Sequence, residues 1–241
     1  MSSDTSSRAP RPRAPVKPGF DPAAQPWQVA DDGLTPVDAS LLTSQALRRI
    51  LSAPPSWSPD PSLEERYRSP GREGPTVQAA VLIPLVVHEA GIRVMLTERA
   101  AHLRDHAGQI SFPGGRIESW DASPVAAALR ETQEETGLTD DYIEVLGSLP
   151  DYVTTTGYSV TPVAALVRPG FVLKPDAFEV ADIFEVPLAF LTDPANHRLH
   201  QATLPDGQQR QFYSMPWQGR FIWGATAAML RNFYHLLRQG R

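Results

Sequence analysis

The chain of 241 residues contains no cysteine, which excludes disulfides, zinc–thiolate sites and a cysteine nucleophile. It also lacks any apolar run of about 18 residues, so no transmembrane helix is expected. The N-terminal residues include scattered arginines, but no apolar stretch follows them, which argues against a secretory signal. These absences predict a cytoplasmic protein that does not insert into a membrane.

A block of basic residues is also missing. The net charge is −5, and acidic and basic residues alternate along the chain. A broad basic face for nucleic acid is therefore not expected. A mildly acidic protein can still bind an anionic small molecule, provided that local cations or a metal ion offset the charge. We expect a small-molecule substrate as the partner, and either a monomer or a homodimer.

Proline is abundant near the N-terminus, where the first 75 residues contain 13 of the 24 prolines. Proline lacks an amide donor and interrupts helices and sheets. We therefore predict that residues 1–60 form a largely disordered N-terminal extension with one short helix over 38–51. The folded domain is expected to span residues 76–238.

Apolar periodicity within that domain predicts both strands and helices. A hairpin is expected from strands 77–87 and 92–97 around Gly91, and a helix over 122–136 is expected to end at Gly137. Further strands are predicted at 142–149, 159–167, 198–204, 210–215 and 219–222, followed by a helix at 226–237. This mixture predicts an α+β fold, an α/β/α sandwich with a mixed sheet between helices.

The acidic segment 129–138 carries the strongest chemical signal. On a helix Glu131 lies on the same face as Glu134 and Glu135, where the three carboxylates repel each other. A divalent cation such as Mg²⁺ or Mn²⁺ would offset that repulsion with oxygen ligands. Arg130 is expected to brace one carboxylate by a charge-assisted hydrogen bond. The alternative is a solvated acidic face near the end of a helix.

Two glycines precede this helix. Gly114 and Gly115 allow the backbone to approach a ligand closely, and Glu118 and Asp121 follow them. We interpret this segment as a phosphate-and-metal cradle. An ordinary turn after Pro113 is the alternative.

Together these residues resemble the box of the Nudix hydrolases. The segment RETQEETGL (130–138) keeps the arginine and all three glutamates of that pattern. Three departures occur: Asp121 replaces a glutamate, one extra residue separates Gly115 from Arg130, and Thr132 replaces an apolar residue.

The preceding segment, LTERAAHLRDHAGQISFPGG (96–115), is similar to the signature of the coenzyme A pyrophosphatases, a subfamily that shares the longer box and the aspartate. The resemblance implies the Nudix fold over about 76–238. It also implies metal-dependent hydrolysis of the diphosphate bond in coenzyme A and its derivatives, to 3′,5′-ADP and 4′-phosphopantetheine or its acyl form. The alternatives are a Nudix pyrophosphatase for ADP-ribose or another nucleoside diphosphate derivative, and a non-catalytic binding module.

The resemblance also implies roles for individual residues. Glu131, Glu135 and Glu134 are expected to bind the metal, with Arg130 beside them. The general base is left open among Glu134, Glu179 and Glu118. The predicted substrate contacts are Arg99, Arg104, Phe112, Gly114 and Gly115. For the two arginines a surface salt bridge with Glu98 or Asp105 is the alternative, and for Phe112 it is a place in the core.

Overall fold

Strand β2 (Val77–His88) runs through the centre of the larger of two sheets and is buried on both faces. Because side chains alternate along a strand, Ala80 and Leu82 pack against helix α2 (Pro124–Thr136), whereas Ile83 and Leu85 join the main core on the opposite face. The computed structural model describes residues 20–31, 33–60, 76–103, 108–204 and 207–240.

The larger sheet has the order β4-β3-β2-β8-β6, with β5 also paired to β2, β7 to β8 and β9 to β3. Strands β2 and β8 are parallel and the remaining pairs are antiparallel, so the sheet is mixed. Its other members are β3 (Gly91–Arg99), β4 (Ile110–Ser111), β5 (Gly114–Arg116), β6 (Ile143–Ser148), β7 (Tyr152–Val153), β8 (Tyr158–Val167) and β9 (Val180–Pro187).

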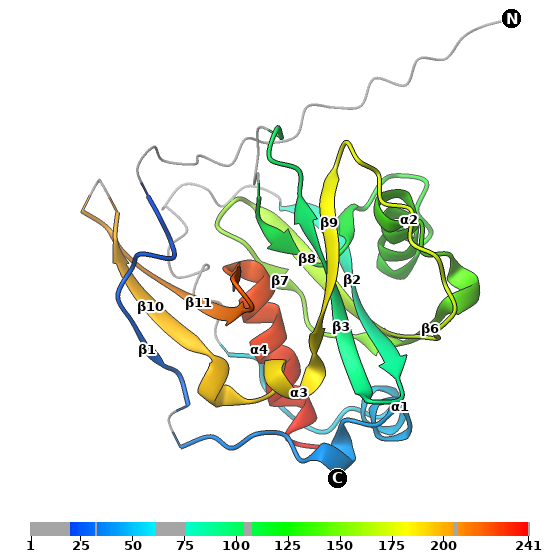
Figure 1. The fold of residues 1–241 in the computed structure, drawn as a ribbon, viewed down its shortest axis with the longest axis horizontal. Coiled ribbons are helices and arrows are strands. Elements are labelled where there is room, and N and C mark those ends of the chain that lie inside the picture. Colours follow the sequence, from blue (N-terminus) through cyan, green and yellow to red (C-terminus); the bar gives the residue numbers. More distant parts are fainter. Residues whose placement is uncertain (1–19, 32, 61–75, 104–107, 205–206, 241) are drawn as a thin grey trace, which may run out of the picture.

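The smaller sheet is antiparallel, in the order β1-β10-β11-β12. It consists of β1 (Trp27–Val29), β10 (Arg198–Thr203), β11 (Gln209–Trp217) and β12 (Arg220–Trp223). Figure 1 shows α2 on one side of the larger sheet, and α4 (Ala225–Leu237) with the smaller sheet on the other. The predicted α+β sandwich with a mixed sheet is therefore confirmed. Short helices α1 (Ser44–Ser52) and α3 (Leu188–Leu191) complete it, with 3-10 turns at Ala39–Leu41, Asp140–Tyr142 and Pro194–Asn196.

Most predicted elements are found within about two residues of their expected bounds, but β9 and the short strands β1, β4, β5 and β7 were not predicted. The sequence of β9 interrupts the apolar pattern with Asp182 and Glu185, because only part of the strand faces the core. Pairing of β9 with β3 brings Glu179 beside Ala100, whose amide donates to the Glu179 carbonyl at 3.0 Å. None of the helices in the described residues is long and apolar enough to cross a membrane.

The expected disorder before residue 60 needs correction, because the structure describes residues 20–31 and 33–60 as part of the fold. The predicted short helix over 38–51 is found as the 3-10 turn Ala39–Leu41 followed by α1. Strand β1 pairs with β10, and Leu47, Ile50 and Leu51 of α1 are buried in the main core. Burial of these apolar side chains stabilises the segment despite its prolines. Residues 1–19 lie outside the described part of the chain.

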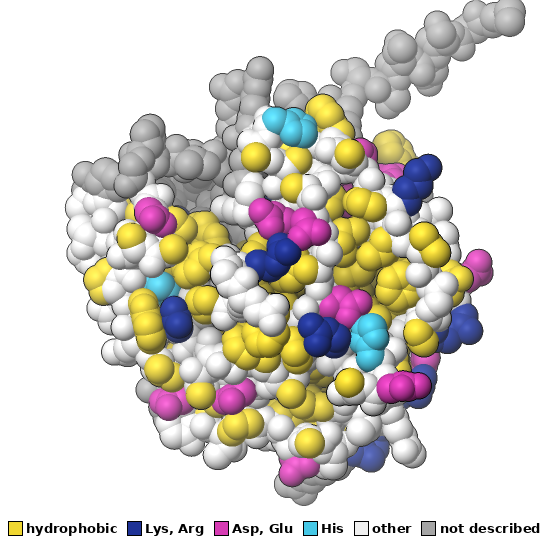
Figure 2. Space-filling model, in the orientation of Figure 1, with side chains coloured by type: hydrophobic (Ala, Val, Ile, Leu, Met, Phe, Trp, Pro, Cys, Tyr) yellow, Lys and Arg dark blue, Asp and Glu magenta, His cyan; other side chains and the backbone are white. Residues whose placement is uncertain are grey.

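A buried arginine on α4 fastens this N-terminal segment to the C-terminal helix. Arg231 donates from Nη1 to the Ala30 carbonyl at 2.8 Å and from Nε to the Asp60 carboxylate at 2.7 Å. Tyr234, one turn further along, donates to the Thr35 carbonyl at 2.9 Å. On the surface shown in Figure 2, acidic and basic side chains of the described residues are scattered among apolar ones, without a continuous basic area.

Candidate active site

Helix α2 positions the acidic residues, and local sequence signals determine where it begins and ends. Ser123 caps it by accepting from the Ala126 amide at 3.2 Å, Pro124 occupies the first turn, and Gly137 ends it in the left-handed conformation with φ of 75°. Because Ala127 and Ala128 pack on the sheet, Glu131 and Glu135 are turned inward and are buried.

Thr132 departs from the apolar residue of the family pattern without leaving a polar group unpaired. Its hydroxyl donates to the Ala128 carbonyl one turn earlier, at 2.7 Å. A buried hydroxyl that has a hydrogen-bond partner costs little, so this departure leaves the helix intact.

Arg130 forms hydrogen bonds with three carboxylates of the acidic cluster rather than with the single one expected. It donates to both oxygens of Asp121 at 2.9 Å, to Glu131 at 2.9 Å and to Glu134 at 3.2 Å. It also donates to the Arg116 carbonyl at 3.1 Å. Asp121, whose role the sequence left open, thus anchors the arginine, and Arg130 lowers the pKa of its carboxyl group.

Gly114 and Gly115 lie on β5 against β2, not in an ordinary turn after Pro113. The Gly114 amide donates to the Glu135 carboxylate at 3.1 Å. A methyl group added at Gly115 would lie 2.4 Å from the carboxyl carbon of Glu131. Glycine is therefore required because the helix carboxylates lie directly against this backbone.

Burial raises the pKa of Glu135 to about 8. The negative charges of Glu131 and Glu179 act in the same direction, whereas the Gly114 amide and Arg99, 4.0 Å away, oppose it. A carboxyl group held among like charges in a buried place is a group whose ionised form a cation would stabilise.

The raised pKa of Glu135 predicts a pH-dependent stability of the metal-free protein. In the unfolded chain the carboxyl loses its proton near pH 4.5, but in the folded chain only near pH 8. The folded state therefore loses stability as pH rises through this window, by a few kcal/mol at about 1.36 kcal/mol per pKa unit. Denaturant unfolding in EDTA between pH 5 and 9 measures the effect. Glu135→Gln should remove this slope, and an unchanged slope would contradict the pKa assigned to Glu135.

Glu131 and Glu135 are buried carboxylates that could hold a divalent cation, whereas Glu134 is turned away. In this arrangement the described His, Asp and Glu side chains include no group of three that could hold a metal ion. The Glu134 side chain is 59% exposed and is paired with Arg130. The expected convergence of all three glutamates is thus not met, because the arginine draws Glu134 to the outer side of the helix.

Gly115→Ala tests the close approach of β5 to the helix. The added methyl group must displace the Glu131 carboxylate, and displacing one group by about 1 Å costs roughly 10²-fold in rate. We expect kcat to fall by that order while the melting temperature changes little, as measured by steady-state kinetics and thermal unfolding. Retention of wild-type kcat by a folded variant would show that the position of Glu131 does not matter.

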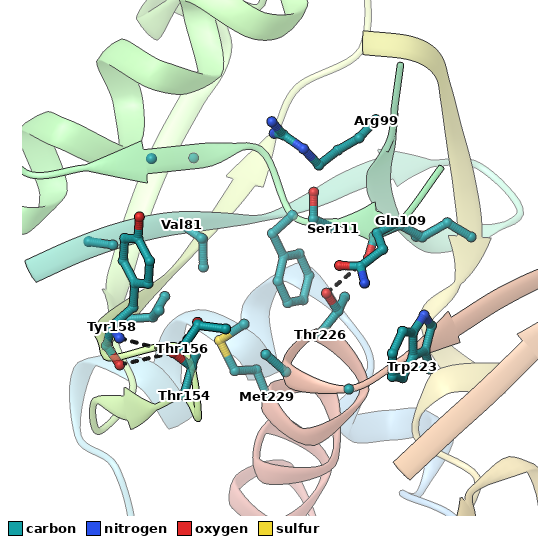
Figure 3. A pocket seen from close by; sticks show the side chains of 18 of the residues that line it. Val81, Arg99, Gln109, Ser111, Thr154, Thr156, Tyr158, Trp223, Thr226 and Met229 are labelled. Atoms are coloured by element: carbon teal, nitrogen blue, oxygen red, sulfur yellow. Dashed lines mark hydrogen bonds between the residues drawn. The ribbon is translucent and has the colours of Figure 1, made fainter. Parts of the chain in front are cut away.

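A cavity of about 310 Å³ lies beside the helix and extends across to the smaller sheet. Arg99 and Gln109 lie on one side of it, and Tyr158, Thr154 and Thr156 on the other (Figure 3). Its other lining residues are Ala79, Val81, Ile110, Ser111, Phe112, Gly114, Gly115, Arg116, Glu135, Thr155, Val160, Arg210, Trp223, Gly224, Ala225, Thr226 and Met229.

The cavity brings together four of the predicted substrate contacts, namely Arg99, Phe112, Gly114 and Gly115. Arg104 lies outside the described residues. Phe112 is also 2% exposed and belongs to the main core, so it serves as a wall of the cavity. Arg99 forms no short salt bridge with Glu98, which instead pairs with Arg220 at 2.9 Å.

The candidate general bases Glu179 and Glu118 have different surroundings. The charge of Glu179 acts on Glu135, whereas the backbone amide of Glu118 is hydrogen-bonded to Asp121 at 2.8 Å. Neither Glu118 nor Glu179 lines the cavity. Sequence reasoning missed Arg116 and Arg210 as cavity residues. The three threonines at 154–156 are an uncommon run that could have drawn attention to the turn that Arg210 contacts.

Comparison of the sequence with known proteins identifies one family. A profile of the NUDIX domain matches residues 76–212. Proteins named "Uncharacterized Nudix hydrolase NudL" from Salmonella newport and Salmonella dublin are each 42% identical over 155 residues, which is 64% of this chain and 80% of the relative. Among solved structures, a MutT protein from Methanosarcina mazei is 23% identical with a TM-score of 0.40, covering 49% of this chain and 82% of that one. An Ap4A hydrolase from C. elegans is 20% identical with a TM-score of 0.40, covering 46% and 80%.

Proposed function

Because this chain belongs to the NUDIX domain family and is a Nudix hydrolase, we propose that it hydrolyses the diphosphate bond of coenzyme A and its derivatives. The products are 3′,5′-ADP and 4′-phosphopantetheine or its acyl form. The observation that carries the proposal is the segment 96–115, which resembles the coenzyme A pyrophosphatase signature and supplies Arg99, Phe112, Gly114 and Gly115 to one cavity beside Glu135.

In this proposal Glu131 and Glu135 would hold Mg²⁺ or Mn²⁺, with Glu134 as a third ligand. A bound divalent cation would supply charge neutralisation at the diphosphate and a lowered pKa for a water molecule. Arg130 keeps Glu131 in place through the 2.9 Å hydrogen bond and is itself fixed by Asp121. The protein thus orients its carboxylates before substrate arrives, which is the basis of electrostatic catalysis.

The proton of the attacking water requires a general base, and Glu134, Glu179 and Glu118 remain the proposed candidates. Glu179 is favoured by its electrostatic coupling to Glu135 and by the pairing of β9 with β3, which places its backbone beside Ala100. Arg99, 4.0 Å from Glu135, is placed to contact a diphosphate oxygen.

Product analysis tests the proposal. The protein is incubated with Mg²⁺ or Mn²⁺ and a mixture of coenzyme A, ADP-ribose, NADH and diadenosine polyphosphates, and the products are identified by mass spectrometry. We expect 3′,5′-ADP and 4′-phosphopantetheine to accumulate first. Preferential formation of AMP and ribose 5-phosphate would instead favour ADP-ribose as substrate, and the absence of any product would favour a binding module. We also propose that the protein is cytoplasmic.

A further inference from the structure

The cavity has a second group of cations on the side away from Arg99. Arg116 extends from β5 of the larger sheet, and Arg210 from β11 of the smaller one. We infer that these two guanidinium groups form a subsite for a phosphate monoester of the substrate, separate from the diphosphate beside Glu135. The inference deepens the proposed function and rests on it, because coenzyme A carries such a group as its 3′-phosphate.

Arg210 contacts the turn that joins β7 to β8, and Arg116 contacts the first residue of β8. The Arg116 Nη2 donates to the Tyr158 hydroxyl at 3.3 Å, and the Arg210 Nη2 donates to the Thr155 hydroxyl at 3.2 Å. The turn is held by hydrogen bonds between Thr154 and Tyr158 at 2.8 and 3.0 Å. Figure 3 shows Tyr158, Thr154 and Thr156 together at this side of the cavity. The two cations therefore line one cavity from two different sheets.

Neither guanidinium is neutralised within the described parts of the chain. The Nε atoms of Arg116 and Arg210 are both buried and have no hydrogen-bond partner there, and neither side chain forms an ion pair. By contrast, Arg48, Arg130 and Arg231 each hold a carboxylate at 2.7–2.9 Å. Both residues are half-buried, and a cation in a cavity is stabilised by an anionic partner, so a bound anion would supply the partner that these guanidinium groups lack.

The charge and position of the pair favour a monoester over a second diester. A phosphate monoester carries close to two negative charges at neutral pH, which matches two guanidinium groups. Arg116 follows Gly115 on β5, so its side chain leaves the opposite face of the strand from the one that contacts Glu131. The subsite is thereby kept apart from the carboxylates, and the apolar residues Val81, Val160 and Met229 line the cavity with it.

Binding without turnover gives the first test. Isothermal titration compares adenosine 3′,5′-bisphosphate with AMP, which lacks the 3′-phosphate, for the wild-type protein and for Arg116→Gln and Arg210→Gln. We expect the wild type to bind the bisphosphate at least about tenfold more tightly, and each variant to lose most of that preference. The matched control is Arg198→Gln, which removes an arginine that stacks 4.0 Å over Trp27 away from the cavity.

Two results would overturn the subsite: no wild-type preference for the bisphosphate, or a preference that survives in both glutamine variants. Arg116→Lys and Arg210→Lys keep the charge, so they replace any glutamine variant that fails to fold and should retain part of the preference.

Turnover of coenzyme A and dephospho-coenzyme A separates this inference from the proposed function. If both are cleaved with the same ratio of kcat/KM in wild type and variants, the subsite is wrong although the function stands. If the bisphosphate preference is lost in the variants but the wild type cleaves neither, the subsite stands and the function is wrong.

Discussion

Glu131→Gln and Glu135→Gln should each lower kcat by at least about 10³-fold, which corresponds to roughly 4 kcal/mol of transition-state stabilisation. Each substitution keeps the shape of the side chain but removes a negative charge from the buried face of α2. A neutral amide is a poor ligand for a hard divalent cation. Initial rates over a range of Mg²⁺ and Mn²⁺ concentrations measure the loss.

The matched control is Glu144→Gln on strand β6. It removes an exposed carboxylate that pairs with Arg48. Its kcat should stay within about twofold of the wild type. Thermal unfolding must show that the Glu131 and Glu135 variants remain folded. Full activity in both folded variants would reject the assignment of these residues to the metal.

Arg130→Met should lower the free energy of unfolding by about 3–5 kcal/mol at neutral pH, the usual cost of breaking a buried ion pair. The reason is that Asp121 and Glu131, with side chains only 4% and 7% exposed, lose their shared cation. Urea unfolding at pH 7 measures the change. Activity should fall as well, because Glu131 is then free to change rotamer.

The comparison variant is Arg48→Met, which removes a bidentate ion pair with Glu144 at an exposed site. Its hydrogen bonds, 2.8 Å each, are as short as those between Arg130 and Asp121. Its cost should be much smaller than that of Arg130→Met, because an exposed ion pair contributes little to stability. Arg130 lowers the pKa of Asp121 below its usual value. The stabilisation from this pair is therefore present above about pH 4 and lost as pH falls through the folded pKa, so the two variants should converge in acid. Equal costs at pH 7 would show that Arg130 is an ordinary surface residue.

Local features of the active site could be predicted from the sequence. Helix α2 was predicted with its end at Gly137, because capping and i,i+4 spacing act within a few residues. The burial of Glu131 and Glu135 follows from the alanines that share their face. The direction of Glu134 could not be predicted, because it depends on which carboxylate a single arginine holds.

Contacts between distant segments account for what the sequence did not reveal. The approach of Gly115 to Glu131 depends on β5 pairing with β2, and the presence of Arg116 and Arg210 in one cavity depends on how two sheets are packed. Local propensity contains no information on either. The prolines before residue 60 indicated disorder, yet burial of Leu47 and Ile50 outweighs them.

The hydrogen bonds of Arg231 to Ala30 and Asp60 affect the order in which a newly made chain folds on the ribosome. Residues 20–60 emerge early, but Ala30 and Asp60 receive their buried cation only when α4 has been synthesised. Until then the apolar side of α1 has only part of its core, and it is exposed to chaperones and to self-association. A stop codon before residue 225 would accordingly yield aggregates or proteolysed fragments, even though every residue of the acidic helix is present.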